Sequence, residues 1–333
     1  MSKKPAIPSV NFITSSLDAI GRLKMAGGIA AVTGGSGMIG GKIVHKLLRR
    51  GYEVRVLTRN KLFRDDNAQV YYGDLENNDV VRVFLKNVSY LFHCAAEVHS
   101  ESKMWDINVL GTERLLHLIP SSGVTYLCYF SSAGVIGVTD NQLVDENSKC
   151  NPQNAYEKSK WAAEELVAKG VGNCSVAILR PTNVIDEQRP GALTLPMRST
   201  WRDRCIVFLK GGECAHIVHA EDVADAAIHF INTHFERSEH FFVSCDHERS
   251  NTFGGLWSMY KAIQEGRSIE GIGPVLHLPI IIPHILRRLW RGSRNYGTVR
   301  YSSGKLLSTG FRYSLGVEGS VRRIAALQRA PIA

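Results

Sequence analysis

The sequence predicts an α/β protein built on a doubly wound parallel sheet, with a smaller and mainly helical C-terminal part. Short β-branched runs alternate with helical stretches through the first half of the chain, which is the pattern of a parallel sheet with crossover helices. The first run, at 29–33, leads directly into a glycine-rich turn and a helix. Because 44% of the 333 residues are hydrophobic, the chain can build a large core without disulfides or metal.

The elements of the first half follow in order from the apolar pattern. The 37–50 stretch predicts a helix because Ile39, Ile43 and Leu47 recur at helical spacing. By the same criterion we expect further helices at 78–86, 104–119 and 154–168. Short β-branched and aromatic runs predict strands at 29–33, 52–58, 69–73, 90–96, 125–132 and 175–180.

The alternation weakens after Pro181, where prolines, tryptophans and arginines become frequent. We therefore expect a nucleotide-binding domain at 28–181 and a C-terminal substrate-binding part at 182–333, which returns some strands and a helix to the core. That part should cap the cleft beyond the carboxyl ends of the strands, where doubly wound sheets bind ligands. Residues 1–27 lack the apolar segment and cleavage site of a signal peptide, and are expected to form a partly ordered extension.

The turn after the first strand predicts a dinucleotide site of the Rossmann type. Gly34 permits the tight turn, Gly37 lets a diphosphate approach the backbone, and Gly40 lets the helix pack closely on the strand. The start of the helix, at Met38 and Ile39, then offers free N–H groups and the positive end of the helix dipole.

The end of the second strand indicates which dinucleotide binds. Sites that prefer NAD usually place Asp or Glu there, about 20 residues past the glycine loop. This chain has Thr58 at that place, followed by Arg59. A carboxylate would repel a 2′-phosphate whereas an arginine can fork onto one, so we expect NADP to be preferred to NAD. Arg55 and Lys61 are secondary candidates for the same role.

A tyrosine and a lysine on the 154–168 helix predict acid–base chemistry. Tyr156 and Lys160 are four residues apart and therefore share one helix face. A neighbouring ammonium favours the phenolate and lowers the pKa of the tyrosine, which can then exchange a proton with an alcohol or a ketone. Ser132, at the end of the 125–132 strand, is expected to hydrogen-bond the substrate oxygen, with Ser131 as the alternative.

An ordered series of motifs over residues 29–235 resembles the extended short-chain dehydrogenase/reductase family, also called the NAD(P)-dependent epimerase/dehydratase family. The resemblance implies a Rossmann fold and hydride transfer at a secondary alcohol or ketone. It rests on TGGSGMIG (33–40), GDL (73–75), HCAAEV (93–98), NVLGT (108–112), FSSAGVIG (130–137), YEKSK (156–160), LRPTNV (179–184) and VHAEDVADA (218–226).

The resemblance also implies roles at the matching positions. Asp74 and Leu75 would flank the adenine, and Asn108 would hold the active-site helix or a water in place. His219 and Asp222 would be structural, at the start of a helix. Further cofactor contacts would come from Cys94, Ala95 and Ala96 along the path of the cofactor, and from Pro181, Asn183 and Val184 beside the nicotinamide, whose ribose Lys160 would also hold.

Three functions remain open at this point. The first is a reductase or epimerase of a nucleotide-activated sugar, although Ala215 stands where many sugar-nucleotide members carry an arginine. The second is an oxidoreductase of an apolar alcohol or ketone, such as a sterol-like or flavonoid-like molecule. The third is a non-catalytic NADP-binding regulator. Candidate substrate contacts are Glu97, Ser132, Ala133, Asn183, Arg202 and Arg204.

The remaining composition bounds the partners. Seven cysteines with irregular spacing and no CxxC fit a reducing cytoplasm, and the twelve histidines form no metal-ligand set. Residues 284–333 hold ten bases and one acid, so this segment carries the whole net charge of +9. An anionic small-molecule substrate is expected near it, with a peripheral membrane contact through 283–290 as an alternative. No nucleic-acid motif accompanies the charge. Family analogy predicts a homodimer through the 104–119 and 154–168 helices.

Overall fold

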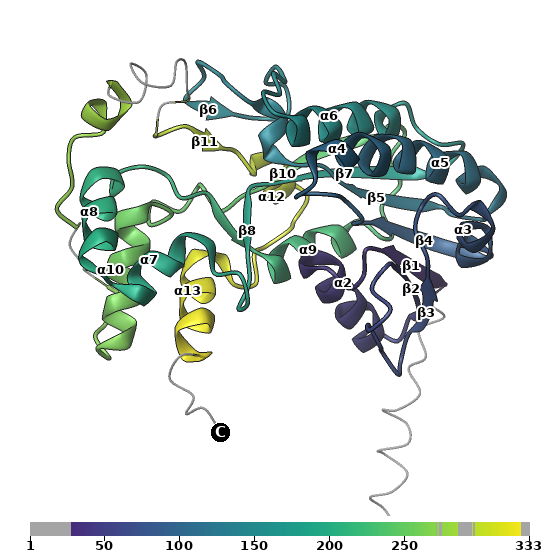
Figure 1. Cartoon of the computed structure of the whole chain (residues 1–333), viewed down its shortest axis with the longest axis horizontal. Coiled ribbons are helices and arrows are strands. Elements are labelled where there is room, and N and C mark those ends of the chain that lie inside the picture. The colour runs from purple at the N-terminus through teal and green to yellow at the C-terminus, as the bar shows by residue number, and fades with distance from the viewer. Residues whose placement is uncertain (1–27, 271, 273–274, 286–294, 296, 328–333) are drawn as a thin grey trace, which may run out of the picture.

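The computed structural model describes residues 28–270, 272, 275–285, 295 and 297–327. The predicted extension at 1–27 therefore lies outside the described residues, as does most of the 283–290 segment. Seven parallel strands form the central sheet, in the order β10-β7-β5-β4-β1-β2-β3 (Figure 1). Their bounds are β1 Ile29–Thr33, β2 Glu53–Thr58, β3 Gln69–Tyr72, β4 Val88–His93, β5 Tyr126–Phe130, β7 Ser175–Pro181 and β10 Glu239–Val243.

The predicted doubly wound sheet is confirmed. β1 lies between β4 and β2, and the strand order runs outward in opposite directions on its two sides. This reversal creates a crevice at the carboxyl ends of β1 and β4, where open α/β sheets bind ligands. The largest shift from the expected bounds is in β4, which begins at Val88 and ends at His93 rather than spanning 90–96.

Helices cover both faces of the sheet and enclose two apolar cores (Figure 1). On one face, Ile43, Val44 and Leu47 of α2 (Met38–Arg49) pack with α9 (Ala220–His229). On the other face lie α3 (Asn78–Leu85), α5 (Gly111–Leu118) and α6 (Ala155–Ala168). The apolar spacing that predicted the 37–50 helix thus marks the side chains that α2 buries.

The predicted 104–119 helix is a composite of three helical types. It begins with α4 (Glu101–Met104), widens into the π-turn η1 (Trp105–Leu110), continues as α5 and ends in the 3₁₀ turn η2 (Ile119–Ser121). π-Turns are rare and concentrate at functional sites. This one carries Asn108, whose role is described below.

The chain beyond Pro181 is mainly helical among the described residues, and it returns β10 to the sheet and α9 to α2. Two small parallel sheets pair β8 (Asn183–Ile185) with β9 (Ile217–His219), and β6 (Leu143–Val144) with β11 (Arg300–Tyr301). The short turn η3 (Ala133–Ile136) follows β5. The remaining elements are η4 (Gly191–Leu193), α7 (Thr194–Arg198), α8 (Trp201–Lys210), α10 (Phe253–Gln264), α12 (Gly304–Ser308) and α13 (Gly316–Leu327).

The described bases of the C-terminal segment are bonded within the chain. Arg300 donates to the carbonyl of Asp246, and Lys305 contacts Glu239. Arg312, Arg322 and Arg323 bind, respectively, two backbone carbonyls, Glu318, and the pair Glu187 and Glu221. These five bases therefore make contacts within the chain. The other five lie outside the described residues: Arg287, Arg288, Arg291, Arg294 and Arg329.

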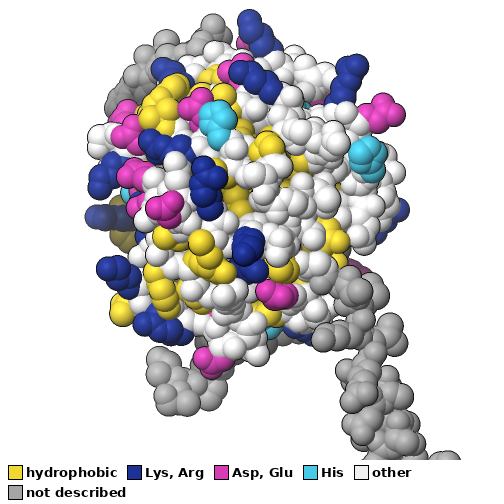
Figure 2. Space-filling view, turned by 90° about the vertical axis from the view of Figure 1, so that its right-hand side faces the viewer, with side chains coloured by type: hydrophobic (Ala, Val, Ile, Leu, Met, Phe, Trp, Pro, Cys, Tyr) yellow, Lys and Arg dark blue, Asp and Glu magenta, His cyan; other side chains and the backbone are white. Residues whose placement is uncertain are grey.

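Over the described residues, no helix is long and apolar enough to cross a membrane. All seven cysteines are free thiols. No group of three or more His, Cys, Asp or Glu side chains within the described ranges is arranged to hold a metal ion. On the face shown in Figure 2, acidic and basic side chains are interspersed with hydrophobic ones and do not gather into a patch of one sign.

Candidate active site

Two cavities meet at the carboxyl edge of the sheet. One, of about 500 Å³, extends from the glycine loop along the ends of β2 and β3. The other, of about 710 Å³, extends from the same loop to α6 and the C-terminal part. Gly34, Gly37, Cys94 and Ala96 line both cavities. The two therefore form one continuous groove, with the glycine loop at its centre.

The glycine loop fits the diphosphate of a dinucleotide. Gly34 has a φ of +67°, and a Cβ there would lie 2.8 Å from the backbone nitrogen of Ala95. At Gly40, a Cβ would lie 2.4 Å from the carbonyl oxygen of Gly34. Gly37 caps α2 without a side-chain hydrogen bond, which leaves the first amides of the helix for an anion. The backbone thus forms a close cradle that side chains would fill.

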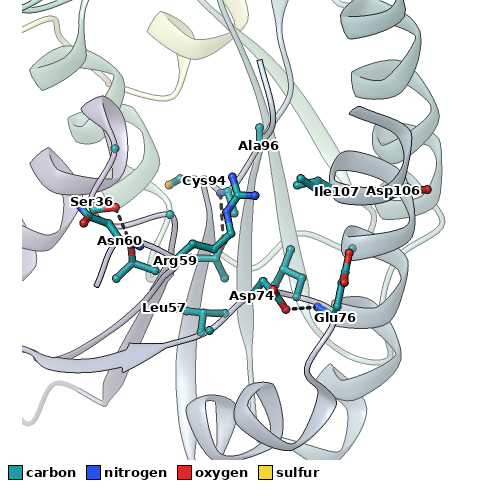
Figure 3. A pocket seen from close by; sticks show the side chains of 18 residues that line it. Ser36, Leu57, Arg59, Asn60, Asp74, Glu76, Cys94, Ala96, Asp106 and Ile107 are labelled. Atoms are coloured by element: carbon teal, nitrogen blue, oxygen red, sulfur yellow. Dashed lines mark hydrogen bonds between the residues drawn. The ribbon is translucent and has the colours of Figure 1, made fainter. Parts of the chain in front are cut away.

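The first cavity holds the residues predicted to select the cofactor (Figure 3). Arg59 extends from the end of β2 toward Cys94 and Ala96. Asp74 and Leu75 line the wall beyond β3, as the resemblance implied. The Asp74 carboxylate accepts from the N–H groups of Glu76 and Asn77, at 3.0 and 3.2 Å, so its own loop holds it in place.

Three polar residues at this cavity, Ser36, Thr58 and Asn60, had no role assigned to them from the sequence. Ser36 and Thr58 join their hydroxyls at 2.7 Å, and Thr58 Oγ1 also accepts from the N–H of Asn60. These groups line the cavity beside Arg59. Their position next to the glycine loop and Arg59 was the available signal. Arg55, a secondary candidate, is excluded because its guanidinium donates to the carbonyls of Phe84 and Lys86, and Lys61 is not among the residues that line this cavity.

Arg59 has an acidic partner in Glu97. Arg59 Nη2 lies 3.6 Å from Glu97 Oε2, so the pair spans the carboxyl ends of β2 and β4, on either side of β1. The N–H groups of His99 and Ser100 donate to Glu97 and, with Arg59, lower the pKa of its carboxyl. Glu97 was expected to contact substrate. Instead it faces Arg59 and is absent from the lining of the second cavity.

Tyr156, Lys160 and Ser132 meet in the second cavity, together with Ser131. α6 brings the first two there because Asn154 and Glu157 form a capping box that starts the helix one residue before Tyr156. Ser132 follows the end of β5, and its hydroxyl accepts from the N–H of Gly134 at 3.1 Å. Met38, Ile39, Gly40, Pro181, Asn183 and Val184 also line this cavity.

The electrostatics of the tyrosine and lysine differ from the sequence expectation. Spacing alone predicts that the Lys160 ammonium lowers the pKa of Tyr156. In the structure, burial raises the pKa of Tyr156, and a hydrogen bond with Ser132 opposes the rise. Burial also lowers the pKa of Lys160 to about 7. Removal from water dominates because both groups lie deep in the cleft, where the charged form of each is disfavoured.

The rings of Tyr129 and His93 lie near Lys160 and are neutral at neutral pH. Lys160 Nζ lies 4.4 Å from the centroid of the Tyr129 ring. Burial lowers the pKa of His93 to about 3, so this ring is uncharged at neutral pH. Its two nitrogens are hydrogen-bonded to the hydroxyls of Thr33 and Thr112, at 2.7 and 2.9 Å. His93 therefore joins β1 and β4 to α5 directly below the glycine loop.

Asn108 holds the active-site helix, as the resemblance implied. Its side chain accepts from the N–H of Glu97 at 2.7 Å, and donates to the Glu97 carbonyl at 3.0 Å and to Ser159 Oγ at 2.9 Å. Ser159 lies beside Lys160 on α6. Asn108 itself is buried and does not line either cavity, and its hydrogen bonds position α6.

Three further predicted substrate contacts, Arg202, Arg204 and Ala133, do not line the second cavity. Arg202 and Arg204 lie on α8: the first packs over the ring of Trp201, and the second lines a separate groove beside Phe208 and Trp257. Neither lines the second cavity. Ala133 points into a small apolar core with Ile136, Val144, Phe242 and Val299. Sequence position cannot show these orientations, because they follow from how α8 and η3 pack against distant elements.

The side of the second cavity away from the glycine loop is largely apolar. Val98, Ile185, Ala215, Ile217 and Phe253 line it, and Arg189 is the arginine among its lining residues. The Asn183 side chain is engaged with the carbonyl of Ala215 at 2.8 Å. Arg189 and Phe253 were missed, since neither lies in a motif.

His219 and Asp222 both have structural hydrogen bonds, but those of Asp222 reach a distant helix. His219 accepts from the N–H of Glu221 and so caps α9. The Asp222 carboxylate accepts from the N–H groups of Ser314, Leu315 and Gly316, and so ties α9 to the start of α13. These bonds join two helices of the C-terminal part, and α9 in turn packs against α2.

Comparison with known proteins is consistent with this site. A model of the NAD dependent epimerase/dehydratase family matches residues 30–243. UDP-glucose 4-epimerase of Lactobacillus helveticus is 32% identical over 41% of this chain and 45% of its own length. Mouse sterol-4-alpha-carboxylate 3-dehydrogenase, decarboxylating, is 29% identical over 55% of this chain and 53% of its own length. The chain thus spans about half the length of these curated relatives.

Solved structures extend the likeness in fold to nearly the whole chain. UDP-glucose 4-epimerase of Thermotoga maritima, solved with UDP-glucose, superposes with a TM-score of 0.66 at 21% identity, over 90% of this chain and 98% of that one. The family match covers more than half of the 333 residues and includes the glycine loop, Ser132, Tyr156 and Lys160. The chain therefore belongs to the NAD dependent epimerase/dehydratase family, which contains NAD(P)-dependent epimerases and dehydrogenases.

Proposed function

We propose that this chain catalyses NADP-dependent hydride transfer at a secondary alcohol or ketone, with Tyr156 as the general acid and base. The observation that carries the proposal is the meeting of Tyr156, Lys160 and Ser132 in a cavity continuous with the glycine-loop groove. When bound, NADP(H) supplies or accepts the hydride at its nicotinamide ring. The intact triad disfavours the alternative of a non-catalytic regulator.

Each side chain of the triad has a defined task. Tyr156 donates a proton to the carbonyl oxygen during reduction, or takes one from the hydroxyl during oxidation. Ser132 donates a hydrogen bond to the same oxygen and stabilises the charge that develops on it. The Lys160 ammonium holds the cofactor ribose and favours the phenolate of Tyr156, against the burial that raises the pKa of this phenol.

The preference for NADP rests on Arg59. Its guanidinium lines the first cavity, which contains no acid at the end of β2, and Ser36 and Asn60 lie beside it. We expect Arg59→Ala to lower the ratio of NADPH to NADH affinity at least about tenfold, since a charge-assisted pair contributes about 1.5–3 kcal/mol. Fluorescence titration measures both dissociation constants. Lys61→Ala is the control, and an unchanged ratio in Arg59→Ala would remove the assignment.

For the substrate, the described part of the cavity favours an apolar secondary alcohol or ketone. Its far wall is built from Ile185, Ala215, Ile217 and Phe253, and the two arginines expected to bind a diphosphate lie elsewhere. A reductase or epimerase of a nucleotide-activated sugar is the second candidate. Arg189 supports it, because this arginine lines the cavity with no salt bridge among the described residues.

A homodimer is the assembly we infer. The helical row α4–η1–α5 packs beside α6, and both lie on one face of the sheet (Figure 1). That arrangement offers the two-helix surface through which the family commonly pairs. Sedimentation velocity measures the assembly: we expect the mass of a dimer, and a monomer at micromolar concentration would contradict it.

A further inference from the structure

A fully buried acid lies one helical turn beyond the proposed catalytic lysine. Glu164 has an exposed fraction of 0% and follows Lys160 by four residues on α6. Tyr156, Lys160 and Glu164 therefore recur at four-residue intervals along one side of the helix. A glutamate is almost never fully buried without a partner, and this one has two.

Arg180 of β7 and His240 of β10 hold the Glu164 carboxylate. Arg180 Nε lies 3.2 Å from each carboxylate oxygen, and its Nη2 lies 2.5 Å from Oε1. His240 Nε2 is 3.2 Å from Oε1. Burial alone raises the pKa of Glu164, but hydrogen bonds from His240 and Arg180 outweigh it and bring the pKa to about 2. Glu164 is thus a permanent negative charge inside the protein.

Lys160 is in the opposite situation. Its side chain is only 3% exposed and faces the Tyr129 ring, which is a weak substitute for water. Burial lowers its pKa to about 7, so the ammonium is close to losing its proton at neutral pH. Glu164 is the first group that opposes this loss, followed by Cys94.

The groups that face Lys160 show why Glu164 has this effect. On β4, His93 is neutral and burial raises the pKa of the Cys94 thiol, so neither carries charge at neutral pH. On β5, burial likewise raises the pKa of Tyr129. The charged groups near it are then Glu164 on the same helix and Arg180 beyond that carboxylate.

We propose that Glu164 is a positioning residue for the reaction: anchored by Arg180 and His240, its carboxylate keeps the Lys160 ammonium charged in the cavity that Lys160 shares with Tyr156. This inference rests on the proposed function of Tyr156 and Lys160. It assigns to the Glu164–Arg180 pair a task in catalysis beyond joining α6 to β7.

The test compares Glu164→Gln with Glu165→Gln, its exposed neighbour on α6. Glutamine keeps the shape of Glu164 and removes its charge, so Lys160 should lose its proton at lower pH. We expect the alkaline limb of the kcat/KM–pH profile to move down by about one unit, which is roughly a tenfold change in the protonated fraction. Glu165→Gln should leave the kcat/KM–pH profile unchanged. Glu164→Asp keeps the negative charge and should therefore have a profile close to that of the wild type.

Titration of Lys160 itself gives a readout independent of turnover. In protein labelled with ¹³C at lysine Cε, the Lys160 signal is assigned by its loss in Lys160→Arg. Its titration midpoint should fall in Glu164→Gln and stay in Glu165→Gln. If Glu164→Gln fails to fold because Arg180 is left as an unpaired buried cation, the double variant Glu164→Gln/Arg180→Leu removes both charges.

The outcomes distinguish a failure of this inference from a failure of the proposed function of Tyr156 and Lys160. An unchanged profile and an unchanged Lys160 midpoint in Glu164→Gln would overturn the role of Glu164, even if Tyr156→Phe and Lys160→Met are inactive. Full activity of Tyr156→Phe and Lys160→Met would overturn the proposed function instead.

Discussion

At the scale of single residues, the site places a lysine where its charge is disfavoured. Its folded pKa of about 7 lies below the ordinary 10.5, so the folded protein binds fewer protons than the unfolded chain between these values. Stability therefore rises with pH through this window. The cost of burying the ammonium is fully present below about pH 7, and fades toward pH 10.5.

Lys160→Met should consequently stabilise the protein while abolishing turnover. We expect the free energy of unfolding to increase by about 1–3 kcal/mol at pH 6.5, because an apolar side chain replaces a buried charge. The gain should shrink as the pH approaches 10. Urea denaturation at several pH values measures it, with Lys158→Met, an exposed lysine of the same helix, as the control. A loss of stability at pH 6.5 would contradict the account.

Residue types and spacing predicted which residues meet in the cleft, but not the surroundings of those residues. Tyr156, Lys160, Ser132 and Arg59 all line the cavities for which they were selected. Their pKa shifts could not be foreseen, because the burial that causes them arises from strands far away in the chain. Arg202 was misplaced for the same reason: its charge suits an anion, but its position on α8 turns it away from the cleft.

At the scale of elements, two adjacent glycines at the start of α2 differ in how much space they leave for a Cβ. A Cβ at Gly40 would lie 2.4 Å from the Gly34 carbonyl oxygen, whereas one at Gly41 would lie 3.5 Å from that of Gly35. Gly40→Ala must therefore separate helix and loop, and overpacking of this kind costs about 1–3 kcal/mol.

Gly40→Ala should weaken NADPH binding by about tenfold or more, since 1.4 kcal/mol is a factor of ten in affinity. Gly41→Ala should bind NADPH normally and gain about 0.5–1 kcal/mol of stability, because alanine favours the helix interior. Fluorescence titration and thermal unfolding measure the two effects. Equal affinity in both variants would show that close packing at Gly40 is unnecessary for binding.

The π-turn is a feature of the helical row that the apolar pattern did not predict. The apolar period of 104–119 indicates a helix, and a helix is present, but nothing in that period marks the widening at 105–110. The widened turn carries Asn108, whose three hydrogen bonds connect the Glu97 backbone to α6. The partners of Asn108 lie 11 and 51 residues away, so only the folded chain shows why the turn is there.

At the scale of the whole molecule, charges connect the two halves. Lys42 and Lys46 of α2 bind Glu187, Glu221 and Asp225, and Arg323 of α13 binds the first two of these acids. The helix that follows the glycine loop is thus joined to the part that supplies the far wall of the second cavity. The charge of residues 284–333 predicted an anionic partner near this segment. Among the described residues, its five bases bind acids or backbone carbonyls of the same chain.

Because the two halves are joined, a ligand that binds the cleft should stabilise the whole molecule. The size of this stabilisation can distinguish the two substrate classes. A ligand at 100 times its dissociation constant raises the unfolding free energy by about 2.7 kcal/mol. Saturating NADP should do so, and UDP should add nothing if the substrate is an apolar alcohol or ketone. Thermal unfolding with NADP, with and without UDP, GDP or dTDP, measures this. A further shift with any of these nucleotides that is lost in Arg189→Ala would establish the sugar-nucleotide alternative.

Transfer of deuterium from the cofactor tests the central claim most directly. [4-²H]NADPH is incubated with a panel of apolar ketones and keto-sugar nucleotides, and mass spectrometry follows deuterium at the carbinol carbon. The wild-type protein should label one class of product. Tyr156→Phe should lower the rate by about 10²–10⁴-fold while NADPH affinity stays unchanged, as expected for loss of a general acid. Labelling by Tyr156→Phe at the wild-type rate would contradict the account.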